Sequence, residues 1–180
     1  LVNQTGYGLT SGLESLDERE WDYWKRHIRA GNLYINRVTT GAIVLRQPFG
    51  GMGKSGFGPG MKAGGPNYVA QFMDFEEVPT PHDGALPQMS TLAALCRGLQ
   101  ADPFDGSAQI VAAALSYERN QRAEFGAEHD HFRLVGQDNV RRYLPVGSVR
   151  VRVHADDTAF DVFGRVCAAH VAGCRVVIST

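Results

Sequence analysis

The stretch GNLYINRVTTGAIVLRQPFGGMGKSGFGPGMKAGGP, residues 31–66, decides how this chain is interpreted. Residues 32–37 alternate with a period of two, as in a half-buried strand. A short turn follows at residues 40–42. Residues 47–66 then contain eight glycines and three prolines, which predicts a structured loop without a helix or a long strand.

The residues before this stretch predict a helix. Ser15 and Glu18 have the S-x-x-E spacing of a capping box. Apolar residues then recur at helical spacing on one face: Trp21, Trp24 and Ile28. We expect the helix to end at Ala30, with Gly31 just after it, where a positive φ costs least. A turn and strand over residues 6–13 complete a strand–helix–strand unit, typical of parallel α/β sheets.

The rest of the chain predicts a second α/β unit. The expected elements are a strand at 67–78, a linker at 79–89, helices from Ser90 and over 107–125, a strand at 146–153, a helix from Asp156-Asp157 to Ala172, and a strand at 175–178. The last three again have the order strand–helix–strand. The chain is therefore predicted to be α/β throughout, with domains at 1–78 and 90–180.

Composition excludes several classes of partner. With 180 residues and a formal net charge of −1, the chain has no bulk positive field for nucleic acid. No apolar stretch approaches the ~20 residues of a membrane span. The three cysteines are odd in number and lack CxxC spacing, which favours reduced thiols in a cytoplasmic protein.

Two motifs suggest ligands that their context argues against. Residues 51–56 fit G-x-G-x-x-G, but a dinucleotide site needs a helix to begin after them, and Phe57-Gly58-Pro59-Gly60 cannot open one. Residues 53–55 imitate the end of a P-loop, but Pro48 stands where its first glycine is required. Glu128-His129-Asp130-His131 has zinc-ligating residue types, but no further ligands at helix spacing support a metal site over a solvated loop.

The turn at Thr40-Gly41-Ala42 has a different character. Small side chains allow a ligand to approach the backbone, and successive N–H groups in such a turn can form an anion-binding concavity. From the residues alone, Gly41 could equally form a plain turn and Phe49 could be a core aromatic.

The order of residues 31–66 resembles the end of the catalytic domain of aldehyde dehydrogenases. Its details, with Gly6-Tyr7-Gly8-Leu9-Thr10-Ser11-Gly12 and Lys62-Ala63-Gly64-Gly65-Pro66, resemble the Δ1-pyrroline-5-carboxylate dehydrogenases, including those carried by bifunctional proline utilization A proteins. The resemblance implies that the N–H groups of Gly41 and Ala42 receive the α-carboxylate of the substrate, L-glutamate γ-semialdehyde. It also implies that Phe49 packs against the substrate's aliphatic chain.

The resemblance also implies what this chain lacks. The family's nucleophilic cysteine, general-base glutamate and NAD-binding domain would lie upstream, so no catalytic residue is predicted here and the chain alone should be inactive. FAD would belong to the parent if it is bifunctional. Lys62 is expected to be a surface or subunit-contact charge, and residues 67–78 are expected to form an edge strand that pairs with another subunit.

The second unit resembles, more weakly, the start of an aldehyde dehydrogenase nucleotide-binding domain, over Tyr143–Gly147, residues 168–173 and residues 175–178. It departs where the family binds its cofactor: His154-Ala155-Asp156-Asp157 follows the first strand, and Ser179 replaces a lysine. Because adjacent carboxylates repel a pyrophosphate, we expect a Rossmann-like pseudo-repeat that does not bind NAD.

Two hypotheses follow. The leading one is a C-terminal piece of an NAD-dependent Δ1-pyrroline-5-carboxylate dehydrogenase, packed against upstream domains of the same polypeptide, with a small-molecule substrate. The alternative is a non-catalytic assembly module in which the turn no longer binds a ligand. An upstream reading frame with a cysteine in a Gly-Gln-x-Cys-like context would favour the first.

Overall fold

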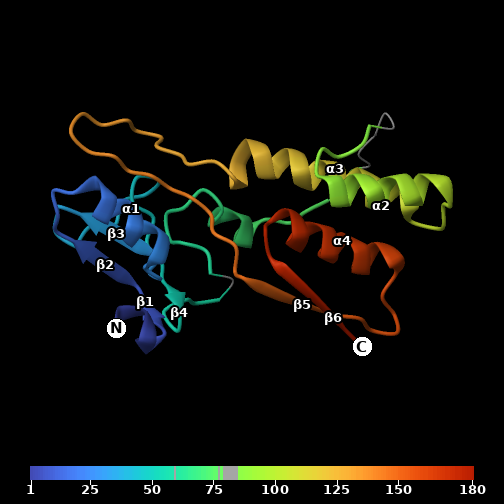
Figure 1. Cartoon of the computed structure of the whole chain (residues 1–180), viewed down its shortest axis with the longest axis horizontal. Coiled ribbons are helices and arrows are strands. Elements are labelled where there is room, and N and C mark those ends of the chain that lie inside the picture. The colour runs from blue at the N-terminus through green and yellow to red at the C-terminus, as the bar shows by residue number, and fades with distance from the viewer. Residues whose placement is uncertain (59, 77, 79–84) are drawn as a thin grey trace. The chain divides into compact units, whose positions relative to one another are not determined.

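The computed structural model describes residues 1–58, 60–76, 78 and 85–180 (Figure 1). Its internal contacts divide the chain into two compact units. Unit 1 comprises Leu1–Glu76 and Asp130–Asn139, and unit 2 comprises Glu77–His129 and Val140–Thr180. The sequence-based division at 79–89 differs in one respect, because it places residues 130–139 with the second domain. Most of that predicted linker lies outside the described residues.

Unit 1 contains the predicted strand–helix–strand arrangement. Its elements are η1 (Val2–Thr5), β1 (Tyr7–Gly8), β2 (Thr10–Leu13), α1 (Glu18–His27), β3 (Asn32–Ile35), β4 (Met52–Gly53) and η2 (Val69–Phe72). Strands β2 and β3 are parallel and α1 connects them, which confirms the prediction. A second small pair, β1 with β4, is antiparallel and joins the start of the chain to the glycine-rich loop.

Both ends of α1 differ in detail from the prediction. Asp17, not Ser15, caps the helix, and its carboxylate accepts the Arg19 N–H at 2.9 Å. The Ser15 hydroxyl instead accepts the Asp17 N–H. The helix already ends at His27, and Gly31 does not have a positive φ. Gly31 is required for another reason, because an added Cβ would overlap the carbonyl oxygen of Gly50.

The two predictions for residues 47–78 have different outcomes. The described part of residues 47–66 forms a loop whose only strand is the two-residue β4, as expected. The strand predicted over residues 67–78 is wrong, because η2 is a 3₁₀ helix and none of the described residues in this range pairs in a sheet. Alternating aromatic residues favour a strand only where a neighbouring strand can supply hydrogen bonds.

Unit 2 packs three helices and a two-stranded parallel sheet. Its elements are α2 (Ser90–Ala101), α3 (Ser107–Asn120), the π-helical turn η3 (Gln121–Phe125), β5 (Ser148–Arg152), α4 (Ala159–Val171) and β6 (Arg175–Ser179). These elements confirm the predicted helices and the second strand–helix–strand unit. The core comprises Leu92, Cys96, Leu99, Ile110, Val111, Ala114, Cys167 and Val171.

The start of α4 differs from the prediction that Asp156-Asp157 begins it. Thr158 caps the helix in a reciprocal capping box with Asp161. Asp157 lies outside the helix, where its carboxylate accepts the His154 N–H and pairs with Arg165. These contacts, led by the bond from the His154 N–H, lower the pKa of Asp157. Gly173 ends the helix as predicted, with φ of 77°.

In the part of the chain that the structure describes, no helix is both long and apolar enough to cross a membrane.

Candidate substrate-carboxylate site

The turn that carries Gly41 and Ala42 is exposed in unit 1. Gly41 has φ of 118°, which an L side chain adopts only with strain, so glycine is required at this position. Within the described residues, the N–H groups of Gly41 and Ala42 donate to no other group of the chain. The turn therefore presents two available backbone donors on small residues, as an anion site requires.

Two buried side chains support this turn. Tyr34, from β3, is 5% exposed and its hydroxyl donates to the Gly41 carbonyl at 3.0 Å. Gln47 is 9% exposed. With its amide nitrogen facing Gly41, Gln47 donates to the same carbonyl at 2.9 Å and its oxygen accepts from Arg37 Nη1 at 2.7 Å. The Arg37 guanidinium also lies 5.4 Å from the centre of the Tyr34 ring, a cation–π distance.

A tight hairpin connects the turn to Phe49. Ile43 and Gln47 exchange backbone hydrogen bonds of 3.1 and 2.8 Å. Phe49 in turn exchanges two bonds of 2.9 Å with Ala63, and its side chain is half-buried. Gln47 thus links the two predicted parts of the site, since its side chain contacts Gly41 and its backbone leads directly to the segment of Phe49.

Lys62 and Asn32 hold the Phe49 segment on the start of β3. The Lys62 ammonium donates to the carbonyls of Gly31 and Gly50, at 2.5 and 2.7 Å, and to Asn32 Oδ1 at 3.3 Å. Asn32 donates to the Pro48 carbonyl at 2.9 Å. Lys62 is therefore not the surface charge that the sequence suggested. Burial lowers its pKa from 10.5 to about 8.

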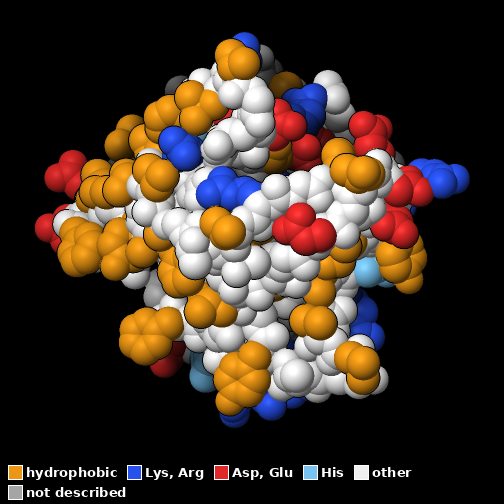
Figure 2. Space-filling model, turned by 90° about the vertical axis from the view of Figure 1, so that its left-hand side faces the viewer, with side chains coloured by type: hydrophobic (Ala, Val, Ile, Leu, Met, Phe, Trp, Pro, Cys, Tyr) orange, Lys and Arg blue, Asp and Glu red, His pale blue; other side chains and the backbone are white. Residues whose placement is uncertain are grey.

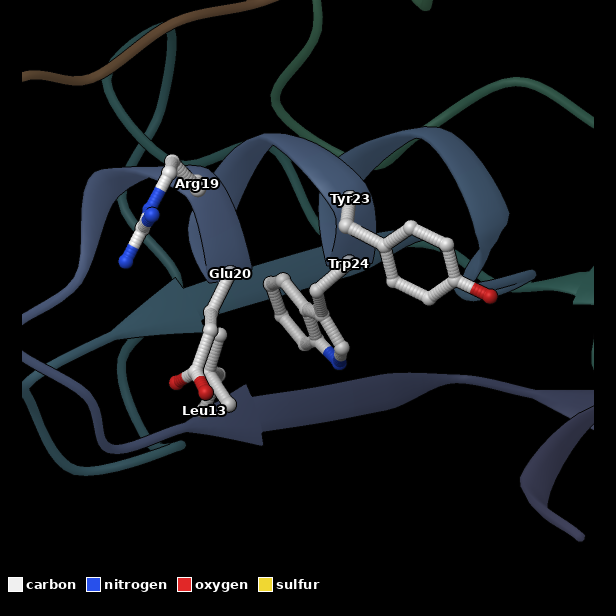
Figure 3. A pocket seen from close by; sticks show the side chains of 5 residues that line it. All are labelled: Leu13, Arg19, Glu20, Tyr23 and Trp24. Carbon is white, nitrogen blue, oxygen red and sulfur yellow. The ribbon is translucent and has the colours of Figure 1, made fainter.

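The pocket shown in Figure 3 is separate from this site. It lies in unit 1 between α1 and the end of β2, where Trp24 and Glu20 extend from the helix towards Leu13. Arg19 and Tyr23 complete its lining. None of the predicted site residues contributes to it, so the substrate-carboxylate hypothesis depends on the turn and not on this pocket.

The described residues do not favour a metal site or a reactive cysteine. Across the described ranges, no group of three or more His, Cys, Asp or Glu side chains could hold a metal ion. His129 contacts the Glu124 carboxylate at 3.4 Å, and Asp130 accepts backbone N–H groups of its own loop. Cys96 and Cys167 are buried among the helices of unit 2, and burial raises the pKa of Cys167 to about 11. Such a thiol is a poor nucleophile.

The turn between β5 and α4 carries two carboxylates, of Asp157 and Asp161, which would repel the negative charge of a nucleotide pyrophosphate. A pyrophosphate binds through N–H groups at the start of a helix. Here the Asp161 N–H donates to the Thr158 hydroxyl, and the Asp161 carboxylate accepts the Thr158 N–H. The Asp157 carboxylate adds a negative charge next to them.

Comparison with known proteins relates residues 1–78 to a family of dehydrogenases. Residues 1–78 match the sequence model of the aldehyde dehydrogenase family. These residues belong to the aldehyde dehydrogenase family. The 1-pyrroline-5-carboxylate dehydrogenase 2 of Halalkalibacterium halodurans is 44% identical over 78 residues, which are 43% of this chain and 15% of that dehydrogenase.

The similarity to PutA proteins extends beyond the aldehyde dehydrogenase region. The bifunctional protein PutA of Klebsiella aerogenes is 30% identical over 188 residues, covering 98% of this chain and 14% of that protein. The structure of Proline Utilization A (PutA) from Corynebacterium freiburgense matches 99% of this chain and 17% of its own, with 40% identity and a TM-score of 0.77. The chain spans between 5% and 15% of the length of the curated relatives it matches.

The sequence predicted Gly41, Ala42 and Phe49 but missed the residues that hold them. Tyr34, Arg37, Gln47 and the Asn32–Lys62 pair all lie in or beside the predicted strand and loop. A polar residue in a glycine-rich loop is ordinarily solvated, so nothing in the sequence indicated that Gln47 and Lys62 would turn inward. The one available signal was Tyr34, because the hydroxyl of a tyrosine needs a hydrogen-bond partner when its ring is buried.

Proposed function

We propose that this chain is part of an NAD-dependent Δ1-pyrroline-5-carboxylate dehydrogenase in proline catabolism, and that unit 1 binds the carboxylate end of L-glutamate γ-semialdehyde. One observation carries the proposal: the exposed Gly41–Ala42 turn has backbone N–H donors without partners among the described residues, on a chain similar to PutA proteins and to a 1-pyrroline-5-carboxylate dehydrogenase.

The contribution of this chain to the reaction is orientation. A carboxylate held by Gly41 and Ala42 fixes one end of the substrate, and the half-buried Phe49 ring offers an apolar surface for its methylene groups. A thiolate supplied by another part of the polypeptide would then attack an aldehyde that is already in place, which makes the step effectively intramolecular. NAD, bound outside these residues, would accept the hydride, and water would release L-glutamate.

For unit 2 we propose a structural role without nucleotide binding. The carboxylates of Asp157 and Asp161 at the start of α4, together with the Asp161 N–H already bonded to Thr158, argue that the second strand–helix–strand unit does not bind the nucleotide. We therefore assign NAD, and FAD in a bifunctional parent, to other regions of the polypeptide. Unit 2 then serves packing or assembly.

A surface property of unit 1 favours an additional role in assembly. Exposed apolar residues follow one another in the segment after the loop: Val69, Phe72, Met73 and Phe75. Figure 2 shows hydrophobic side chains at many points of one face of the molecule. Contiguous apolar patches of several hundred Å² usually mark contact surfaces. We propose that residues 69–76 contact another subunit or another region of the same polypeptide.

The substitution Ala42→Asp in the full-length protein tests the carboxylate role. Two negative charges within about 4 Å repel by roughly 4 kcal/mol at an effective dielectric near 20, so kcat/KM for L-glutamate γ-semialdehyde should fall by two orders of magnitude or more. An uncharged aldehyde such as butanal should lose much less. Ala42→Asn, which has the same shape without the charge, is the matched control. Equal losses with both aldehydes would refute the carboxylate role.

A further inference from the structure

We infer that Tyr34 and Gln47 are positioning residues that fix the direction of the Gly41–Ala42 peptide, so that its N–H faces the ligand carboxylate, and that Arg37 orients Gln47. The inference rests on the proposed function. It assigns a role to buried side chains that touch the turn from the protein side and do not need to touch substrate.

The argument begins with the Gly41 carbonyl. Its oxygen accepts from the Tyr34 hydroxyl at 3.0 Å and from the Gln47 amide at 2.9 Å. Both donors are buried, so the carbonyl points into unit 1. Gly41 and Ala42 are joined by a planar trans peptide, in which the C=O and the N–H point in opposite directions. The Ala42 N–H must therefore point outward, to the exposed side of the turn.

Without these two donors, nothing would hold that peptide in one orientation. Gly41 at φ of 118° has access to more backbone conformations than any other residue type, and rotation of the peptide would turn the Ala42 N–H away. An unpaired carbonyl in the interior is also unfavourable. The two donors thus convert a mobile glycine turn into a preorganised one, which lowers the cost of binding an anion.

Arg37 determines which end of the Gln47 amide faces Gly41. Its Nη1 donates to the amide oxygen at 2.7 Å, so the amide nitrogen is directed to the Gly41 carbonyl. Among the described residues Arg37 has no carboxylate within salt-bridge distance. Its charge is therefore not neutralised by a neighbouring acidic side chain, and it adds to the attraction of an anion at the turn.

The first test is Tyr34→Phe in the full-length protein. This substitution keeps the ring that packs under Arg37 and removes only the hydroxyl. We expect KM for L-glutamate γ-semialdehyde to rise about fivefold, while kcat with this substrate and KM for butanal stay near the original values. Titration with the product L-glutamate should show a similar loss of affinity. Tyr7→Phe is the matched control, because the exposed Tyr7 hydroxyl makes no hydrogen bond among the described residues.

A second variant, Gln47→Glu, replaces the amide donor by a carboxylate that still pairs with Arg37. Its oxygen would face the Gly41 carbonyl, so we expect a larger selective rise in KM for the semialdehyde. If the original protein does not oxidise L-glutamate γ-semialdehyde, the proposed function fails. If it does, but both variants change KM for the two aldehydes equally or not at all, the positioning roles are refuted while the proposed function stands.

Discussion

Lys62 is a cation without a carboxylate partner among the described residues, held by two carbonyls and an amide oxygen in unit 1. Replacing it removes a charge from a partly buried site but also releases the Gly31 and Gly50 carbonyls. Because the pKa of Lys62 is lowered to about 8, the effect of replacing it on the free energy of unfolding depends on pH.

The sign follows from proton linkage. Between pH 8 and 10.5 the unfolded chain holds the Lys62 proton while the folded chain has lost it, so the folded state gains stability as pH rises through this window. The full shift would correspond to about 3 kcal/mol, and solvent screening of the partly exposed side chain reduces this to ~1 kcal/mol between pH 7.5 and 9.5.

Urea unfolding of this chain and of Lys62→Met at both pH values measures the effect. The fluorescence of Trp21 and Trp24 reports on unit 1, where both tryptophans lie. We expect the free energy of unfolding of the original chain to rise relative to that of the variant on going to pH 9.5. A fall in this difference would contradict the burial of an ionisable ammonium at this position.

Single residues also mark the limit of what the sequence predicts. Gly31 and Lys62 were both noted in advance, but with the wrong reasons, because a glycine needed for close approach and a lysine that turns inward depend on segments distant in the chain. For Gly41 the sequence suggested close approach of a ligand, which stays a prediction, and the structure adds a second reason for glycine, a φ of 118°.

Among the elements, α2 depends on a residue of another helix. Met89, its N-cap residue, supplies no side-chain hydrogen bond. The Glu118 carboxylate of α3, which is 4% exposed, accepts the N–H groups of Gln88 and Met89 at 2.9 and 2.6 Å. A carboxylate at this end also suits the helix dipole. Glu118 therefore caps α2 from outside the helix.

Glu118→Ala should destabilise unit 2 by about 2 kcal/mol, since two N–H groups lose a charged acceptor. Urea unfolding followed by far-UV circular dichroism measures this, because α2, α3 and α4 all lie in unit 2. Glu128→Ala, which removes an exposed carboxylate 3.8 Å from Arg142, should change the free energy by less than about 0.5 kcal/mol. Similar losses for the two variants would refute the capping role.

Element boundaries show why helices were predicted more reliably than their caps. Repeating apolar positions indicated α2, α3 and α4, because a buried face leaves a periodic signal in the sequence. A helix cap, in contrast, depends on a single side chain and leaves no repeating pattern in the sequence. Asp17 and Thr158 took the roles expected of Ser15 and Asp156-Asp157. The strand expected at 67–78 had a suitable pattern but no partner in the described chain, and pairing cannot be inferred from one strand alone.

At the scale of the whole molecule, the exposed segment 69–76 predicts association. Phe72 and Phe75 are 78% and 77% exposed. We expect the 180-residue chain to self-associate at micromolar concentrations, and Phe72→Ser with Phe75→Ser to weaken this association at least tenfold. Sedimentation at several concentrations measures it. Phe57→Ser, at a residue that is 93% exposed elsewhere in unit 1, is the control. A compact monomer at every concentration would contradict the assembly role.

The residues that make up unit 1 determine where this protein can be divided into separately folding pieces. Residues 130–139 belong to unit 1 although their neighbours in the chain belong to unit 2. Within unit 1, the amide group of Gln47 lies 3.3 Å from Asn139 Oδ1. The family match ends at residue 78, but a piece cut there would lack ten residues of the unit. The end of the family match is thus not a limit of folding, and a transplanted aldehyde dehydrogenase segment would have to bring the later loop with it.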